Sequence, residues 1–127
     1  MKLSYITLTV EDVDKVREWY VTYFDMQVVL SDRDAVVLAT PEGPALELRK
    51  GRPLDHPERI TLGFEVEDVD VTFKRLSDGK LPFLNGPRNT RWGRRVASLK
   101  DPAGHTVEVF TLVAEDSRKM LTVPAGQ

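Results

Sequence analysis

Cysteine is absent from this chain of 127 residues, and histidine occurs only twice. Without cysteine the chain has no disulfide bond, no thiolate nucleophile and no thiolate metal ligand. No apolar run approaches the roughly 20 residues that a helix needs to cross a bilayer. The first residues also lack the apolar core of a signal peptide. These absences predict a cytoplasmic protein without a membrane partner.

The charge of the chain has no strong excess of either sign. The 18 lysines and arginines and the 20 aspartates and glutamates give a formal net charge of -2. Nucleic acids and anionic membranes attract concentrated positive charge, so neither is expected as a partner. Hydrophobic residues make up 41% of the chain. At this length that fraction is sufficient for a globular core.

A five-residue motif occurs twice in the chain. Val-Glu-Asp-Val-Asp begins at Val10 and again at Val66, an offset of 56 residues. A strand-like run precedes each copy, and each half ends in a similar run whose glutamates, Glu47 and Glu108, are 61 residues apart. The second half therefore has about five additional residues, which we place in a loop at residues 85–91. Such self-similarity indicates a duplicated structural unit.

Each half has the pattern of a strand, a helix and three further strands. Alternating apolar and polar residues predict a strand over residues 5–10, and apolar and aromatic residues at helical spacing predict a helix from Val13. Asp12 is expected to cap this helix, and Asp25 to adopt a left-handed conformation after it. The other predicted elements are strands near residues 26–30, 35–39 and 45–49, then a strand at 60–66, a helix at 69–77, and strands near 82–84, 94–99 and 106–112.

The two halves are predicted to form one domain over residues 1–114. A stretch with two prolines and a glycine, residues 51–57, is expected to link a first module of about residues 1–50 to a second of about residues 58–114. Residues 115–127 are expected to form a C-terminal tail.

The combined motifs resemble the vicinal oxygen chelate superfamily, which includes glyoxalase I, extradiol dioxygenases and bleomycin-binding proteins. The resemblance rests on the repeated Val-Glu-Asp before a helix, the Trp19-Tyr20 pair, and the run from Trp92 to Glu108 with its Asp-Pro-Ala-Gly-His-Thr-Val-Glu ending. It implies an α+β fold of two tandem βαβββ modules, which form a U-shaped, curled mixed sheet with the helices on the convex side. It also implies a homodimer with concave clefts that bind a small molecule.

Alternation along the strands then assigns residues to the helix side or to the cleft. The residues expected to face the helices are Ile6, Leu8, Val10, Leu62, Phe64 and Val66. The residues expected to line the cleft are Tyr5, Thr7, Thr9, Glu47, Thr61, Gly63, Glu65 and Glu108.

Metal-using members of the superfamily take four ligands from the first and last strands of their two units. Carried over by position, these ligands correspond to Tyr5, Glu47, Thr61 and Glu108. Both carboxylates are present, but no imidazole is, and a threonine hydroxyl is a poor ligand for zinc or iron. We therefore predict no metal cofactor. The alternative is a divalent metal such as Mg²⁺, held by the two carboxylates and water.

The two glutamates and the two histidines each have a structural and a functional interpretation. Glu47 and Glu108 are either solvated or paired with arginine, or they bind a polar ligand and transfer a proton, with Tyr5 as a further catalytic group. His56 is expected to be exposed in the linker, and His105 to support the turn at residues 101–104.

Trp92 and Arg94 are predicted to share one strand face, and Arg95 to occupy the other. A large amphipathic ring suits stacking on a planar ligand, and Arg94 suits recognition of a carboxylate or phosphate. The alternatives are simple packing for Trp92 and a solvated strand edge for the arginines. The predicted ligand-binding residues are thus Tyr5, Thr7, Thr61, Trp92 and Arg94.

These observations favour metal-free binding of a small polar or aromatic molecule in a concave cleft, as in the bleomycin-resistance branch of the superfamily. One alternative is a metal-dependent lyase, isomerase or oxygenase of the glyoxalase/dioxygenase type that uses Glu47 and Glu108. Another is metal-free acid–base catalysis by either carboxylate with Tyr5 as the proton donor.

Overall fold

The computed structural model describes residues 1–113, apart from the side chain of Trp92. The predicted tail at residues 115–127 lies outside the described residues. The chain divides into two compact units. The first contains Met1–Arg59 together with Asp101–His105, and the second contains Ile60–Lys100 and the chain from Thr106 onward.

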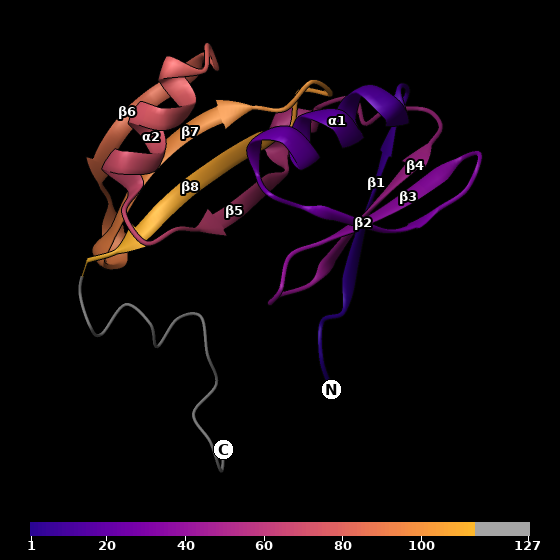
Figure 1. Cartoon of the computed structure of the whole chain (residues 1–127), viewed down its shortest axis with the longest axis horizontal. Helices are drawn as coiled ribbons and strands as arrows, with labels where there is room; N and C mark the ends of the chain where they lie inside the picture. Colours follow the sequence, from indigo (N-terminus) through magenta and orange to yellow (C-terminus); the bar gives the residue numbers. More distant parts are fainter. Residues whose placement is uncertain (114–127) are drawn as a thin grey trace. The chain divides into compact units, whose positions relative to one another are not determined.

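Both units have the same order of elements (Figure 1). The first unit contains β1 (Tyr5–Val10), α1 (Val13–Tyr23), β2 (Gln27–Ser31), β3 (Ala35–Ala39) and β4 (Ala45–Lys50). The second contains β5 (Thr61–Glu65), α2 (Val69–Asp78), β6 (Phe83–Asn89), β7 (Arg94–Lys100) and β8 (Thr106–Leu112). Two short 3-10 helices, η1 (Pro57–Arg59) and η2 (Arg91–Gly93), precede β5 and β7. The predicted order of elements is confirmed in both halves.

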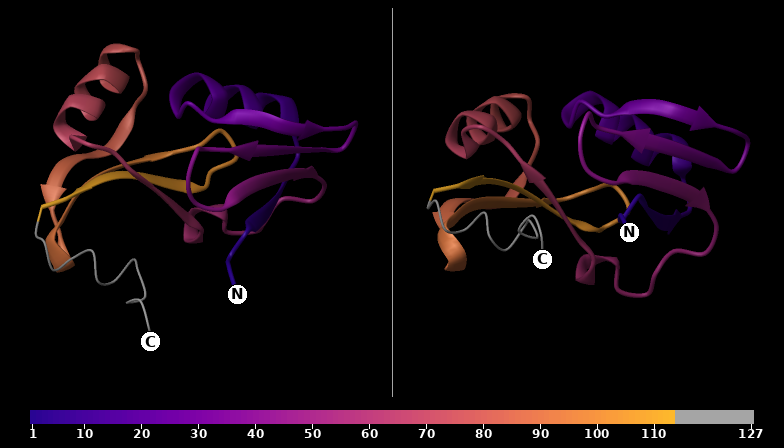
Figure 2. Two further views of the ribbon diagram at one scale, coloured as in Figure 1. Left: turned by 60° about the horizontal axis from the view of Figure 1, so that its bottom comes forward. Right: turned by 90° about the horizontal axis from the view of Figure 1, so that it is seen from below.

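Each unit forms one four-stranded mixed sheet. The strand orders are β1-β4-β3-β2 and β5-β8-β7-β6, so the duplication extends to topology. In both sheets the first strand pairs in parallel with the last, and the other neighbours are antiparallel. Each helix packs against one side of its own sheet (Figure 2). This is the predicted α+β fold of two tandem βαβββ modules.

The helix ends follow from the aspartates that the sequence places there. The Asp12 carboxylate accepts a hydrogen bond from the backbone N–H of Lys15 at 3.0 Å, and Asp68 accepts two at the start of α2. These bonds satisfy donors that have no partner within the helix. Asp25, just after α1, has a φ of 54°. The predicted cap and left-handed residue are therefore both confirmed.

The helix-facing side of the first sheet carries the core of its module. Leu8 and Val10 of β1 are buried there together with Leu38 of β3 and Leu48 of β4. Ile6 belongs to the same side by alternation, but 36% of it remains exposed, so burial along β1 begins only at Leu8.

In the parts of the chain that the structure describes, no helix is both long and apolar enough to span a bilayer.

The additional residues of the second module lie within a strand. We expected a strand at residues 82–84 and a loop at 85–91, which was wrong. Strand β6 continues to Asn89, and its pairing with β7 shifts twice, after Phe83 and after Asn85. Bulges of this kind absorb extra residues while the strands stay paired. Pro87, which lacks an N–H, is tolerated because β6 is an edge strand.

The turn before the last strand is also duplicated. Residues 40–44 and 101–105 both read x-Pro-x-Gly-x, and Gly43 and Gly104 each have a φ of 91°. A side chain is strained in this conformation, which explains glycine at both positions. The two turns differ in their surroundings. A Cβ atom at Gly104 would lie 3.1 Å from Cγ of Pro57, whereas one at Gly43 would meet nothing within 4 Å.

Alanine at these two glycines is expected to separate backbone strain from steric contact. Gly43→Ala should lower the free energy of unfolding by about 1–2 kcal/mol, the cost of a side chain at positive φ. Gly104→Ala should lower it further, because its Cβ also presses on Pro57. Urea denaturation of both variants measures the difference. Equal losses of unfolding free energy in the two variants would show that Pro57 moves away from the added Cβ atom without an energetic cost.

Candidate functional site

Glu47 lies on the open face of the first sheet, by which we mean the side opposite α1. The parallel register of β1 and β4 places Thr7 directly beside it. The Thr7 hydroxyl donates a hydrogen bond of 2.7 Å to Oε1 of Glu47. Nη2 of Arg49, two residues further along β4, donates to both carboxylate oxygens at 3.0 and 3.2 Å. The strand register and alternation thus assemble a Thr–Glu–Arg cluster.

These contacts fix the charge state of Glu47. The hydrogen bond from Thr7 lowers the pKa of its carboxyl group below the ordinary value, and the bond and charge of Arg49 act in the same direction. Only 17% of the side chain is exposed, and this partial desolvation raises the pKa. The hydrogen bonds and the charge of Arg49 outweigh it, so the net effect is a lowered pKa. A carboxylate with a lowered pKa is a weak base. Pairing with an arginine, one of the arrangements expected for Glu47, is present.

Tyr5 occupies the same face two residues before Thr7, next to Ala45 in the strand register. Its side chain is among the most exposed large ones in the module, at 64%. Because its neighbour in β4 is small, its ring is accessible from the open face. Tyr5 and Thr7 therefore share a face with Glu47 as predicted.

The open face of the second sheet holds the positional equivalents. Glu108 of β8 lies between Gly63 of β5 and Ser98 of β7 in the strand register. Thr61 lies two residues before Gly63 on the same side and is exposed. Glu108 itself is half-buried. Among the side chains that the structure describes, which do not include Trp92, none donates a hydrogen bond to its carboxylate or forms an ion pair with it.

Arg94 shares this open face, two strand positions from Val96, which pairs with Phe110. Its guanidinium carbon lies 6.0 Å from the centre of the Phe110 ring, a cation–π arrangement that holds the side chain against the sheet. The side chain of Trp92, predicted to accompany it, lies outside the described part of the chain.

The sequence profile of the glyoxalase/bleomycin resistance protein/dioxygenase superfamily matches residues 2–109. The chain belongs to this superfamily. Among curated proteins it is 28% identical over 128 residues to the uncharacterized protein YraH of Bacillus subtilis, covering 89% of this chain and 100% of that protein.

Solved structures of the superfamily share the fold. A glyoxalase/bleomycin resistance protein/dioxygenase from Nocardioides aligns with a TM-score of 0.76 at 17% identity, covering 100% of this chain and 89% of that one. A lactoylglutathione lyase from Agrobacterium tumefaciens aligns with a TM-score of 0.70 at 20% identity, covering 85% and 91% of the two chains. At these identities the likeness concerns the fold and not the activity.

The ligand positions of metal-dependent superfamily members do not form a fitting donor set in this chain. Both oxygens of Glu47 already accept hydrogen bonds, and the guanidinium of Arg49 would repel a cation placed there. Thr61 offers only a hydroxyl group beside Glu108, a poor ligand for zinc or iron. Across residues 1–113, no three histidine, aspartate or glutamate side chains lie close enough to hold a metal ion together.

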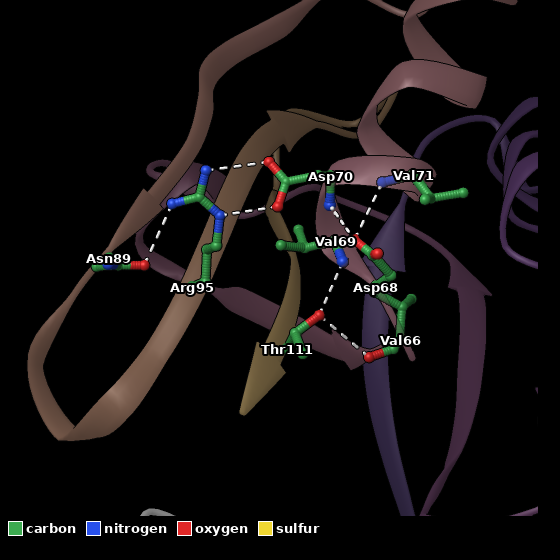
Figure 3. A network of polar contacts seen from close by, with 8 residues as sticks. All are labelled: Val66, Asp68, Val69, Asp70, Val71, Asn89, Arg95 and Thr111. Atoms are coloured by element: carbon green, nitrogen blue, oxygen red, sulfur yellow. Dashed lines mark hydrogen bonds and ion pairs between the residues drawn. The ribbon is translucent and has the colours of Figure 1, made fainter. Parts of the chain in front are cut away.

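Arg95 points to the helix side of β7, opposite to Arg94 as predicted, and has a structural role (Figure 3). Its guanidinium donates to both oxygens of Asp70 at 2.9 and 3.0 Å and to Oδ1 of Asn89 at 3.2 Å. The bond from Arg95 lowers the pKa of the Asp70 carboxyl group. The Thr111 hydroxyl accepts from the backbone N–H of Val69 at 2.8 Å, which adds a second link between the sheet and the start of α2.

Neither histidine of this superfamily member belongs to a strand that forms an open face. His56 is exposed beside Glu58, with Nδ1 3.4 Å from Oε1, as expected for a linker residue. His105 is 1% exposed and supports its turn as predicted, since its backbone N–H donates to Oδ1 of Asp101 at 2.9 Å.

One buried cluster was missed by the sequence analysis. The hydroxyl of Tyr20 donates to Oδ2 of Asp101 at 2.6 Å, and Nδ1 of His105 lies 2.7 Å from the same oxygen. Burial raises the pKa of the Tyr20 hydroxyl well above its ordinary value, and the charge and hydrogen bond of Asp101 raise it further. The Asp101 and His105 side chains are 0% and 1% exposed, so this cluster is closed to ligands. The i,i+4 spacing of Asp101 and His105 was its one sequence signal.

Proposed function

We propose that this protein binds a small polar or aromatic molecule on the open faces of its sheets without a metal ion. The observation that supports this most is the cluster around Glu47. Arg49 supplies the positive charge that a metal ion would bring to the Glu47 carboxylate. The Thr7 hydroxyl also donates a hydrogen bond to this carboxylate. The proposed binding residues are Tyr5 and Thr7 in the first unit and Thr61, Trp92 and Arg94 in the second. The proposal includes the cytoplasmic location inferred from the sequence.

The proposal also includes a homodimer. Edge strand β2 carries three consecutive apolar side chains that are well exposed, with Val28 at 46%, Val29 at 53% and Leu30 at 68%. Apolar edge strands are normally covered in folded proteins because they otherwise pair with other chains. A second copy of the chain would provide such cover. Sedimentation equilibrium distinguishes a dimer from a monomer.

Calorimetric titration of the EDTA-dialysed protein tests the binding function. With a panel that includes bleomycin and doxorubicin, we expect at least one dissociation constant on the order of 1 μM. Protein that has not been dialysed against EDTA should give the same dissociation constant, because no binding residue depends on a metal. Two results together would contradict the proposal: no heat from any compound, and stoichiometric uptake of Mn²⁺, Ni²⁺, Zn²⁺, Fe²⁺ or Mg²⁺ that confers turnover.

Metal-free acid–base catalysis is a second candidate, and one observation favours it. Both oxygens of Glu47 accept hydrogen bonds from Thr7 and Arg49, whereas Gly63 and Phe110 stand in the corresponding places beside Glu108, so the Glu108 carboxylate is the one proposed as the general base. In that case Tyr5 would supply the proton. This function predicts a pH–rate profile that disappears in Glu108→Gln and persists in Glu47→Gln.

A further inference from the structure

The chain has only two asparagines, Asn85 and Asn89, and both lie in edge strand β6. An asparagine loses its side-chain amide when the backbone nitrogen of the next residue attacks Cγ of the side chain. This reaction is fastest before glycine, which has no Cβ atom to restrict the backbone angles that bring the nitrogen to Cγ. Asn85 precedes Gly86, whereas Asn89 precedes the β-branched Thr90. The two asparagines therefore provide a comparison within one strand.

The backbone after Asn85 is irregular and exposed. Strand β6 pairs with β7 at Asn85 and next at Arg88, so the two residues between them, Gly86 and Pro87, have no partner in the register. Residues at such a shift are left unpaired and interrupt the ladder locally. Asn85 and Gly86 are both exposed. Within residues 1–113, no strand pairs with the other side of β6. The ladder therefore holds Gly86 less firmly than its paired neighbours.

The side chains of the two asparagines are restrained to different degrees. Nδ2 of Asn85 donates to Oγ of Ser98 at 3.2 Å, the upper end of the ordinary range. Among the described residues, none donates a hydrogen bond to Oδ1 of Asn85. Oδ1 of Asn89, by contrast, accepts a hydrogen bond from the guanidinium of Arg95. The next nitrogen along is also held, since the Thr90 N–H donates to a backbone oxygen of β7 at 2.7 Å.

We propose that Asn85 is a deamidation site of the folded protein. The backbone nitrogen of Gly86 forms a bond to Cγ of Asn85, and the bond between Cγ and Nδ2 breaks. The side-chain nitrogen takes up the proton that the Gly86 nitrogen releases and leaves as ammonia. Water then opens the resulting succinimide ring at either carbonyl, which leaves aspartate or isoaspartate at position 85. No electrons are transferred, and solvent water is the only other reactant.

Conversion changes the charge of the open face of the second sheet. In the register Asn85 is opposite Ser98, which is opposite Glu108, so the new carboxylate joins the row of Glu108. Neighbouring strands are about 4.8 Å apart, which separates the two backbone positions by about 10 Å. Register and alternation place three basic and two acidic strand residues on this face: Arg88, Arg94, Lys100, Glu65 and Glu108. Deamidation therefore removes the excess of positive charge from a face on which ligand binding is proposed.

Incubation of the folded full chain near neutral pH tests the site, with peptide mapping by mass spectrometry at successive times. Residue 85 should convert at least about tenfold faster than residue 89, because only residue 85 precedes glycine. Isoelectric focusing should show a new form with one negative charge more than the formal net charge of -2. The folded chain should convert at a rate within about a hundredfold of the rate of the urea-unfolded chain, because exposed and unpaired segments open readily.

Three variants make the test specific. Asn85→Gln should abolish the acidic form, because its longer side chain closes a larger ring far more slowly. Asn89→Gln is the matched control and should leave the rate unchanged. Gly86→Ala should slow conversion at least about tenfold, because alanine restricts the backbone that carries the attacking nitrogen. This variant should fold, since a Cβ atom at Gly86 would lie 3.5 and 3.8 Å from atoms of the Phe73 ring, an ordinary contact.

Equal conversion at residues 85 and 89 would overturn the inference, as would an acidic form that persists in Asn85→Gln. An unchanged rate in Gly86→Ala would also overturn it, because the backbone freedom at Gly86 would then play no part. If the folded chain converts more than about a hundredfold more slowly than the urea-unfolded chain, strand β6 protects Asn85 and the inference is wrong.

Discussion

Replacement of Asp101 by alanine is expected to lower the free energy of unfolding by about 3–5 kcal/mol, the largest loss expected from any single substitution considered for this protein. Its carboxylate accepts four hydrogen bonds in the core of the first unit, from Tyr20, from His105 twice, and from the backbone of Ala103. Alanine leaves these donors buried without an acceptor, and an unsatisfied buried polar group costs about 1–3 kcal/mol. Chemical denaturation followed by circular dichroism measures the loss.

Two further variants show whether the hydrogen bonds are responsible. Asp101→Asn keeps an acceptor of the same shape without the charge, so it should fold and lose less than the alanine variant. Asp55→Ala removes a carboxylate whose side chain is 80% exposed, and it should change stability by no more than about 0.5 kcal/mol. If Asp101→Ala is no worse than Asp55→Ala, the cluster does not stabilise the fold.

The sequence predicted the fold because the duplicated features are local. The repeated Val-Glu-Asp motif places a strand, a capping aspartate and a helix within a few residues, and caps act over short distances. Alternation then identified the sides on which Thr7, Glu47 and Gly63 lie, since the side-chain period of a strand is two. The pairing between Thr7 and Glu47 follows once the parallel register is known.

The features that the sequence did not reveal depend on distant contacts or on backbone irregularity. Tyr20 and Asp101 are 81 residues apart, and helical spacing indicated only that Tyr20 is buried, not which acceptor its hydroxyl meets. The shifts in β6 depend on how extra residues distribute along a strand, which alternation alone does not specify. The difference between Glu47 and Glu108 could have been found, because Gly63 and Phe110 replace Thr7 and Arg49 in the printed repeat.

The buried hydroxyl of Tyr20 is expected to make the protein sensitive to alkali. Its pKa is raised in the folded state, so below about pH 10, the ordinary value for tyrosine, it is protonated in both states and adds no pH dependence. Above that pH the unfolded chain releases this proton while the folded chain retains it. Each further pH unit then lowers the free energy of unfolding by about 1.4 kcal/mol, or about 2.7 kcal/mol by pH 12.

The variant Tyr20→Phe isolates this contribution. At neutral pH it should be less stable than the wild type by about 1.5–3 kcal/mol, because it lacks a hydrogen bond to a buried carboxylate. Between about pH 10 and 12 its stability should fall less steeply, so the two curves converge. Tyr5→Phe is the control, since its 64% exposed side chain is solvated in both states, and it should follow the wild type. If the stabilities of Tyr20→Phe and wild type fell in parallel with pH, the Tyr20 hydroxyl would lose its proton without unfolding of the first module.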